Sequence, residues 1–170
     1  MSKEIETERL VIRKWSESDA SALFKYASDE RVSRLALWPA HTSEEMSLSV
    51  IRDIFIPNPD SFAIVLKTTG EPIGCIGLVP IGCEHFAPEC GEREVGYWVG
   101  YPYWGIGIAS EALRGLVGCY RQHSEVSSLL ITVDATNARS VGVAAKCGFH
   151  HVADYNYDGI FSRAYRLELR

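Results

Sequence analysis

The sequence predicts a single mixed α/β domain that extends over residues 1–170, with elements in the order β-α-α-β-β-β-α-β-α-β-β. Three observations predict this class. Segments that alternate in polarity are interspersed with segments whose apolar residues recur at helical spacing. Three strand-like segments in the middle of the chain follow one another without an intervening helix. The length of 170 residues suits one domain with a core of its own.

The first third of the chain predicts one strand and two helices. Residues 8–15 (ERLVIRKW) alternate and are rich in β-branched side chains, which is typical of a strand. Ser16 and Asp19 then have the spacing of a capping box in front of an apolar helix face. Thr42 predicts the start of a second helix, which the segment PNPD at 57–60 ends.

The rest of the chain predicts a strand-rich middle and a closing hairpin. Asn137 has the side chain of a helix N-cap, Gly148 is typical of a helix end, and Asp158 with Gly159 predicts a tight hairpin turn. The expected elements are strands at 61–67, 72–80, 93–100 and 128–136, a helix after Gly107, a helix at 137–149 and a final pair of strands.

Composition and charge exclude several classes of function. A net charge of −5 argues against a general nucleic-acid binder, because such proteins need a basic face. No apolar run is long enough for a membrane helix, and the charged N-terminus lacks a signal peptide, so we expect a cytoplasmic location without a membrane partner. The five cysteines are odd in number and form no C-x-x-C pair, which favours buried, reduced thiols over disulfides.

The segment from 96 to 117 places Gly105 and Gly107 where a helix should begin, with no charged residue beside them. The N-terminus of a helix binds anions through free backbone N–H groups, and glycine allows close approach. A nucleotide P-loop would need a lysine here, and a dinucleotide fingerprint would need glycine where Ser110 stands. The loop is therefore either an anion site built from the backbone or a tight turn without a ligand.

Four segments of the chain favour the anion site. In order, they are TERLVIRKW, EVGYWVG, YWGIGIASEAL and N-x-x-S followed by KCGF. Together they resemble the GNAT acyl-CoA N-acyltransferases, in particular the RimJ/RimL-like branch, over nearly the whole chain. The resemblance implies a GNAT-like fold and acetyl-CoA as co-substrate, with no metal. It implies that coenzyme A is bound by Trp98, Val99, Trp104, Gly105, Ile106, Gly107, Ile108, Ala109 and Asn137.

The resemblance also gives these residues roles. The pyrophosphate lies on the backbone from Trp104 to Ala109, although tryptophan departs from the family's usual arginine or glutamine at that position. The pantetheine arm lies between two separating strands, against backbone groups near Trp98 and Val99, and the backbone N–H near Val99 stabilises the oxyanion. Asn137 pairs with that arm or, alternatively, only caps its helix.

Acetyl transfer to an amine further needs a base and a partner for the leaving thiolate. Glu94 occupies the place of the family's frequent glutamate base; alternatively, it is a solvated or ion-paired strand carboxylate. Lesser base candidates are Glu92, His85 and Asp134. Many members of the family carry a tyrosine that acts as general acid seven residues after the asparagine, but in this chain that position is Ala144. Ser140 is then the nearest hydroxyl for the thiolate, unless it serves as a local cap.

The predicted function is an acetyl-CoA-dependent N-acetyltransferase that works by direct attack. The resemblance to RimJ/RimL implies that the leading acceptor is a protein N-terminal α-amine of the ribosomal-protein type. Such an amine also asks less of the base, since an α-amine (pKa about 7.7–8.0) is neutral far more often than a lysine side chain (about 10.4). The alternatives are a small amine (a polyamine, amino sugar or antibiotic), a non-catalytic coenzyme A-binding sensor and, more distantly, a dinucleotide-dependent oxidoreductase.

The expected partner is an amine acceptor, and the chain is expected to be a monomer or a homodimer. Trp38 and Pro39, together with the loop at 82–92, are expected to border the acceptor site. The acids Glu84, Glu89 and Glu92 of that loop either attract a cationic substrate or only solvate the surface. Two cysteines and a histidine in this loop match no common zinc pattern: Cys83, His85 and Cys90.

Overall fold

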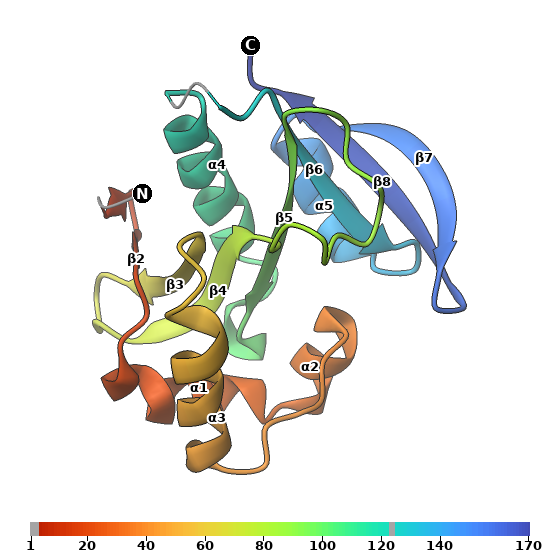
Figure 1. Cartoon of the computed structure of the whole chain (residues 1–170). Coiled ribbons are helices and arrows are strands. Elements are labelled where there is room, and N and C mark those ends of the chain that lie inside the picture. Colours follow the sequence, from red (N-terminus) through yellow and green to blue (C-terminus); the bar gives the residue numbers. More distant parts are fainter. Residues whose placement is uncertain (1–3, 123–124) are drawn as a thin grey trace.

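A computed structural model of the chain describes residues 4–122 and 125–170 (Figure 1). In these residues eight strands form one sheet in the order β1-β2-β3-β4-β5-β6-β8-β7. All neighbours are antiparallel except β5 and β6. The strands are β1 (Ile5–Glu6), β2 (Leu10–Arg13), β3 (Ser61–Leu66), β4 (Pro72–Leu78), β5 (Glu92–Val99), β6 (Ser128–Asp134), β7 (His150–Tyr157) and β8 (Ile160–Glu168).

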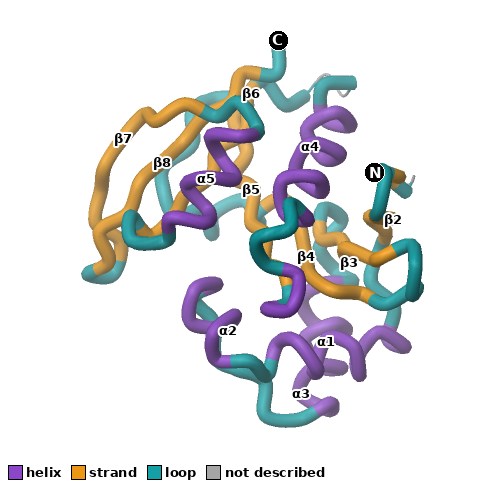
Figure 2. The backbone as a smooth tube through the Cα atoms, turned by 180° about the vertical axis from the view of Figure 1, so that it is seen from behind, coloured by secondary structure: helices purple, strands orange, loops and turns teal. Residues whose placement is uncertain are grey.

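Helices cover both faces of the sheet. Alternate residues of β3 belong to different cores. Ile64 packs in the cluster that contains Leu113 of α4 (Ile108–Tyr120), and Ala63 packs in the cluster that contains Leu23 of α1 (Ala20–Ala27). Figure 2 shows α4 and α5 on the same side of the molecule. The α-helices are α1 (Ala20–Ala27), α2 (Glu30–Ala36), α3 (Glu44–Val50), α4 (Ile108–Tyr120) and α5 (Ala138–Lys146).

The sheet opens between β5 and β6. These strands pair in parallel only from Glu92 to Glu94, against residues 128–130. Beyond that point β5 continues along β4 as far as Val99, while β6 continues along β8 as far as Asp134. Half of the sheet therefore parts from the other half, as the resemblance to the GNAT family implied.

The register along β4 decides which backbone groups of β5 face this opening. The carbonyl of Glu94 accepts from Val79 N at 2.8 Å, and Gly100 N donates to the carbonyl of Ile73 at 2.8 Å. Because backbone groups alternate in an antiparallel pair, those of Trp98 also point toward β4. The backbone groups of Tyr97 and Val99 then point into the opening.

Every predicted strand and helix is present, and the mixed α/β class is confirmed. The capping box of Ser16 with Asp19 is formed, Asn137 caps α5, and the hairpin turn has Asp158 at φ 47° and Gly159 at φ 80°. The predicted order lacked β1 and α2, which are only two and seven residues long.

Two further expectations were wrong in detail. The second predicted helix begins after Ser43 and not at Thr42, because the Ser43 hydroxyl accepts from Met46 N. This helix continues as a π-helical turn at Ile51–Phe55 before the PNPD segment.

The cysteines are free as expected but not fully buried, since Cys83 and Cys90 are exposed and the other three are partly buried. None of the helices in the described residues is long and apolar enough to cross a membrane.

Candidate active site

The glycine loop has the backbone that an anion site requires. Gly105 (φ 78°) and Gly107 (φ 86°) are both in the left-handed region that favours glycine. Gly107 is the N-cap of α4, and the first helical hydrogen bond runs from Glu111 N to the Gly107 carbonyl at 3.0 Å. The N–H groups of the first turn before Glu111 have no partner within the helix, so they are available to a ligand.

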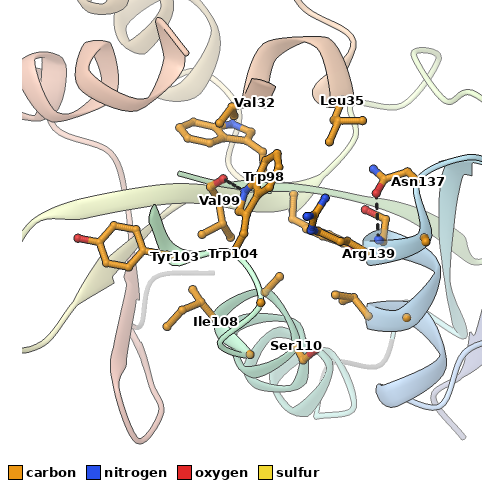
Figure 3. A pocket seen from close by; sticks show the side chains of 18 of the residues that line it. Val32, Leu35, Trp98, Val99, Tyr103, Trp104, Ile108, Ser110, Asn137 and Arg139 are labelled. Carbon is orange, nitrogen blue, oxygen red and sulfur yellow. Dashed lines mark hydrogen bonds between the residues drawn. The ribbon is translucent and has the colours of Figure 1, made fainter. Parts of the chain in front are cut away.

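Two side chains hold this loop in place. The Trp104 indole donates to the Val99 carbonyl at 2.7 Å and so ties the loop to the end of β5 (Figure 3). Arg9 donates to the Ile106 carbonyl at 2.9 Å and pairs with Glu111 at 2.6 Å. Burial raises the pKa of Glu111, but hydrogen bonds from Thr7 and Arg9 outweigh burial and leave it lowered. Glu111 therefore has a structural role in the first turn of α4. Trp104 stands where the family usually has arginine or glutamine, and here it fixes the loop through its hydrogen bond to Val99.

The loop forms one wall of a cavity of about 270 Å³, here called the glycine-loop cavity. Its lining, all within the described residues, includes Arg139 and Lys146 but no Asp or Glu. The Arg139 guanidinium lies over the Trp104 ring, 5.0 Å from its centre (Figure 3). The cavity is thus lined by backbone donors and cationic side chains. Every residue predicted to bind the cofactor lines it except Ile106, which is exposed.

A second cavity of about 620 Å³, here called the Trp38 cavity, lies along the side of β5 that carries Trp98 and Glu94. Its lining includes Glu94 and Asp134 but, among the described residues, no Lys or Arg. Much of its wall is apolar: Leu35, Trp38, Met46, Val50, Ile54, Phe55 and Trp98. The two cavities meet, since six residues line both: Leu35, Ala36, Tyr97, Trp98, Asn137 and Ser140.

Glu94 lies in the Trp38 cavity but is not itself open to a ligand. Its side chain is 2% exposed, and it accepts three hydrogen bonds: from His85 N at 2.7 Å, from His85 Nδ1 at 2.8 Å and from Thr132 Oγ1 at 2.6 Å. A carboxylate only accepts, so Nδ1 of His85 carries the hydrogen. Nε2 of His85 then carries the lone pair of the imidazole. No described residue forms a hydrogen bond to Nε2, so it remains for a ligand.

His85 is the group of this pair that a ligand in the Trp38 cavity reaches. Its side chain is 35% exposed and it lines the cavity. The hydrogen bond to Glu94 raises the pKa of His85, and burial offsets part of that rise. Glu94 and His85 were predicted as separate candidates for the base. The hydrogen bond between them joins residues nine positions apart in the sequence and was not predicted.

The other candidates lie in different surroundings. Glu92 is buried in an ion pair with Arg166, with Nε 2.5 Å from Oε1, and it lines neither cavity. Asp134 lines the Trp38 cavity, and its Oδ1 accepts from the backbone N (2.8 Å) and hydroxyl (2.7 Å) of Thr136. Ser140 lines both cavities, and its N–H donates to Asn137 Oδ1 at 3.2 Å, which is the capping arrangement.

The predicted border of the acceptor site is partly present. Trp38 and Pro39 line the Trp38 cavity, but His85 is the only member of the loop at 82–92 that does so. Glu84 and Glu89 do not line the cavity. Glu84 accepts from Gly82 N, and Glu89 pairs with Arg166. No group of His, Cys, Asp and Glu in the described part of the chain is arranged to hold a metal. The lining residues that were not predicted include Tyr97, Arg139 and Lys146. The basic pair could have been noticed from its place on the helix after Asn137.

Known proteins are similar to this chain in sequence and in fold. The uncharacterized N-acetyltransferase p20 of Bacillus licheniformis is 29% identical over 147 residues, which cover 84% of this chain and 80% of that protein. A Vibrio cholerae structure, provisionally assigned as a ribosomal-protein-serine acetyltransferase, superposes with a TM-score of 0.77 at 21% identity and covers 98% and 97% of the two chains. The structure of AAC(6')-Ib in complex with ribostamycin and coenzyme A superposes with a TM-score of 0.75 at 15% identity and covers 95% and 94%.

The sequence itself gives the family. Residues 9–150 match the acetyltransferase (GNAT) domain, and this range contains the glycine loop, the opening between β5 and β6, and α5. The match spans most of the chain, and the fold agrees with it. The chain therefore belongs to the GNAT family of acetyltransferases.

Proposed function

We propose that this acetyltransferase, of the RimJ/RimL-like branch, transfers the acetyl group of acetyl-CoA to an amine by direct attack. The observation that carries the proposal is the separation of charge between two connected cavities. In the described part of the chain, the charged side chains that line the glycine-loop cavity are the cationic Arg139 and Lys146, which suits an anionic cofactor. Among the described residues, the lining of the Trp38 cavity contains the acids Glu94 and Asp134, together with two histidines, and no Lys or Arg, which suits an amine acceptor.

The residues of the glycine-loop cavity fit coenzyme A. The free N–H groups at the start of α4 would hold the pyrophosphate, and Arg139 and Lys146 supply further positive charge. In the opening, Tyr97 and Val99 present backbone groups to which an extended pantetheine arm can pair as an added strand. The Val99 carbonyl is already occupied by Trp104, so the Val99 N–H remains for the thioester oxygen, where it would stabilise the oxyanion.

On the acceptor side, we propose that Glu94 acts as a base through His85. Glu94 is too buried and too fully hydrogen-bonded to touch an amine itself. It orients His85 so that Nε2 faces the Trp38 cavity and takes the proton that the attacking amine loses. Glu94 is then a positioning residue, and His85 is the group in contact with the substrate.

The leading acceptor in our proposal is a protein N-terminal α-amine, because it needs less help than a lysine to become neutral. A small amine is the second candidate. The Trp38 cavity favours an amine on an apolar body in either case. Its walls are largely apolar, Glu94 is fully engaged, and of its carboxylate oxygens only Oδ2 of Asp134 has no hydrogen bond to a described residue. A polycation would leave several charges without partners.

The function is tested with labelled acetyl-CoA and a panel of amines. We expect label transfer to peptides with an apolar first residue, and to a small apolar monoamine, at a kcat/KM roughly tenfold or more above that of spermidine or ribostamycin. Binding of coenzyme A without transfer to any amine would instead support the sensor. Transfer to polycations at an equal rate would overturn the apolar acceptor class but not the transferase.

Paired variants at the rim of the Trp38 cavity sharpen this test. Ile54 lines the cavity and is 57% exposed, while Ile56 is 49% exposed and does not line it. We expect Ile54→Glu to lower kcat/KM for apolar amines and to raise it for spermidine, because the new carboxylate faces the acceptor. Ile56→Glu is the matched control and should change both values much less.

A further inference from the structure

A second histidine lines the Trp38 cavity, and the proposed reaction gives it no role. His41 lies in the segment between α2 and α3, and it lines the same cavity as His85. The residue is only 9% exposed. Its ring centre lies 5.5 Å from that of Trp38, which in turn lies 5.6 Å from the ring centre of Trp98 on β5. A buried polar side chain in the wall of a substrate cavity calls for an explanation.

Contacts from two helices fix the position of the His41 ring. The backbone N–H of His41 donates to the carbonyl of Ala27, the last residue of α1, at 3.0 Å. Nδ1 of the ring lies 2.7 Å from Oγ of Ser47 in α3. Because the main chain is tied to one helix and the ring to another, the ring keeps one orientation at the cavity wall.

Ser47 determines which nitrogen of His41 carries the hydrogen. The residue is completely buried, and Nδ1 of His41 is the one described group to which its hydroxyl is hydrogen-bonded. If Nδ1 were the donor, the buried hydroxyl hydrogen would have no acceptor, which costs free energy. The hydroxyl therefore donates to Nδ1. Burial lowers the pKa of His41 and so keeps the ring neutral, and its single hydrogen is then on Nε2.

Nε2 of His41 is free to donate to a ligand. No described residue forms a hydrogen bond to it, and it is not among the side-chain atoms of the described residues that are shut off from solvent without a partner. Nε2 is therefore open to solvent, and the cavity that His41 lines is the Trp38 cavity. In His85 the hydrogen is on Nδ1, so Nε2 accepts. The two histidines thus offer the cavity one donor and one acceptor.

We propose that Nε2 of His41 donates a hydrogen bond to a carbonyl oxygen of the acceptor, which is therefore a peptide and not a simple amine. This inference rests on the proposed acetyl transfer and names its substrate class. A protonated amine only donates, so His41 has no lone pair with which to hold it. A carbonyl only accepts, and unlike a sugar hydroxyl it has no hydrogen of its own to place in a largely apolar cavity.

The test compares His41→Phe with the unmodified protein on two acceptors. One is a peptide that begins with leucine. The other is 3-methylbutylamine, which has the same side chain and amine but no carbonyl. Phenylalanine keeps a ring beside Trp38 and has no N–H. We expect kcat/KM for the peptide to fall about tenfold, mainly through a higher KM, and kcat/KM for 3-methylbutylamine to change less than about twofold.

Two further variants separate the lost contact from damage to the fold. His41→Phe leaves the buried Ser47 hydroxyl without an acceptor, so the double variant with Ser47→Ala removes that cost and should show the same selective loss. His150→Phe is the matched control, since His150 is exposed on β7 and lines neither cavity, and it should change neither value. His41→Gln has an N–H to donate and should recover part of the activity on the peptide.

An equal loss for both acceptors, or no loss for the peptide, would overturn the proposal. The same contact can be measured without turnover by titrating the acetylated peptide into the protein with coenzyme A bound. There His41→Phe should bind the peptide about tenfold more weakly. This titration tests His41 even if no amine were acetylated, an outcome that would contradict the proposed function instead.

Discussion

Replacing Gly107 with valine is expected to weaken coenzyme A binding by roughly 10- to 100-fold. The residue has φ 86°, a conformation that a β-branched side chain rarely adopts, and the strain of about 1–3 kcal/mol would force the loop to move. An added Cβ would lie 3.4 Å from Arg9 Nη2, the side chain that also holds the Ile106 carbonyl. Both effects disturb the free N–H groups at the start of α4. Isothermal titration with coenzyme A measures the loss.

Two control variants separate backbone strain from general damage. Asparagine tolerates positive φ, so Gly107→Asn should retain clearly more affinity than Gly107→Val. Gly118→Ala, at a helical position where a Cβ meets no atom within 4 Å, should bind coenzyme A normally. Equal affinity of Gly107→Val and the unmodified protein would show that these amides do not hold the cofactor.

Replacing His85 with glutamine is expected to lower kcat/KM by about 100-fold, because the variant has no group of suitable basicity at the acceptor. His85 does not line the glycine-loop cavity, so coenzyme A affinity should be unchanged. Steady-state kinetics with a peptide that has a free N-terminal amine and a separate binding titration provide the two measurements. A change in both would indicate a folding defect, which a thermal melt would reveal.

The pH dependence of the reaction distinguishes the roles of His85 and Glu94. His85 must be neutral to accept a proton, so activity rises as pH rises through its pKa, which Glu94 raises above the ordinary value of about 6.5. Glu94→Gln weakens the contact that raises the pKa of His85 and leaves the burial that lowers it. The acidic limb of the kcat/KM profile should therefore move to lower pH, with a reduced plateau because His85 is less well oriented.

A second histidine–carboxylate pair supplies the control for these variants. Nε2 of His151 lies 2.7 Å from Asp154 Oδ1 on the surface, outside both cavities. His151→Gln should leave the rate and its pH profile unchanged. If His85→Gln kept full activity while Glu94→Gln abolished it, Glu94 would be the direct base and our assignment would be wrong.

Features that depend on neighbouring residues could be predicted from the sequence. The turn at Asp158 and Gly159, the cap at Asn137 and the start of α4 at Gly107 all follow from local backbone preferences. Between two adjacent hydroxyl residues, the choice of Ser43 over Thr42 as the cap was not determined by spacing alone. Helix α2 escaped prediction because its short, charged segment, ERVSRLA, has too few apolar residues to show a helical period.

The arrangement of the candidate site could be predicted only in part. Tyr97 belongs to a strand that was predicted, but which side of the sheet it faces depends on the register with β4. The link between His85 and Glu94 requires the loop between them to fold back onto β5, and no local pattern encodes that fold. Arg139 gains its place over Trp104 from the packing of α5 beside the glycine loop. Such contacts arise from tertiary structure.

β5 and β6 pair at only three positions, so beyond them a gap connects the two faces of the sheet. In the proposed reaction the acyl donor occupies the glycine-loop cavity and the acceptor occupies the Trp38 cavity. On this proposal the acetylated product leaves from the Trp38 cavity while coenzyme A is still bound on the other side. The order of binding and release then follows from the relative affinities of the two substrates.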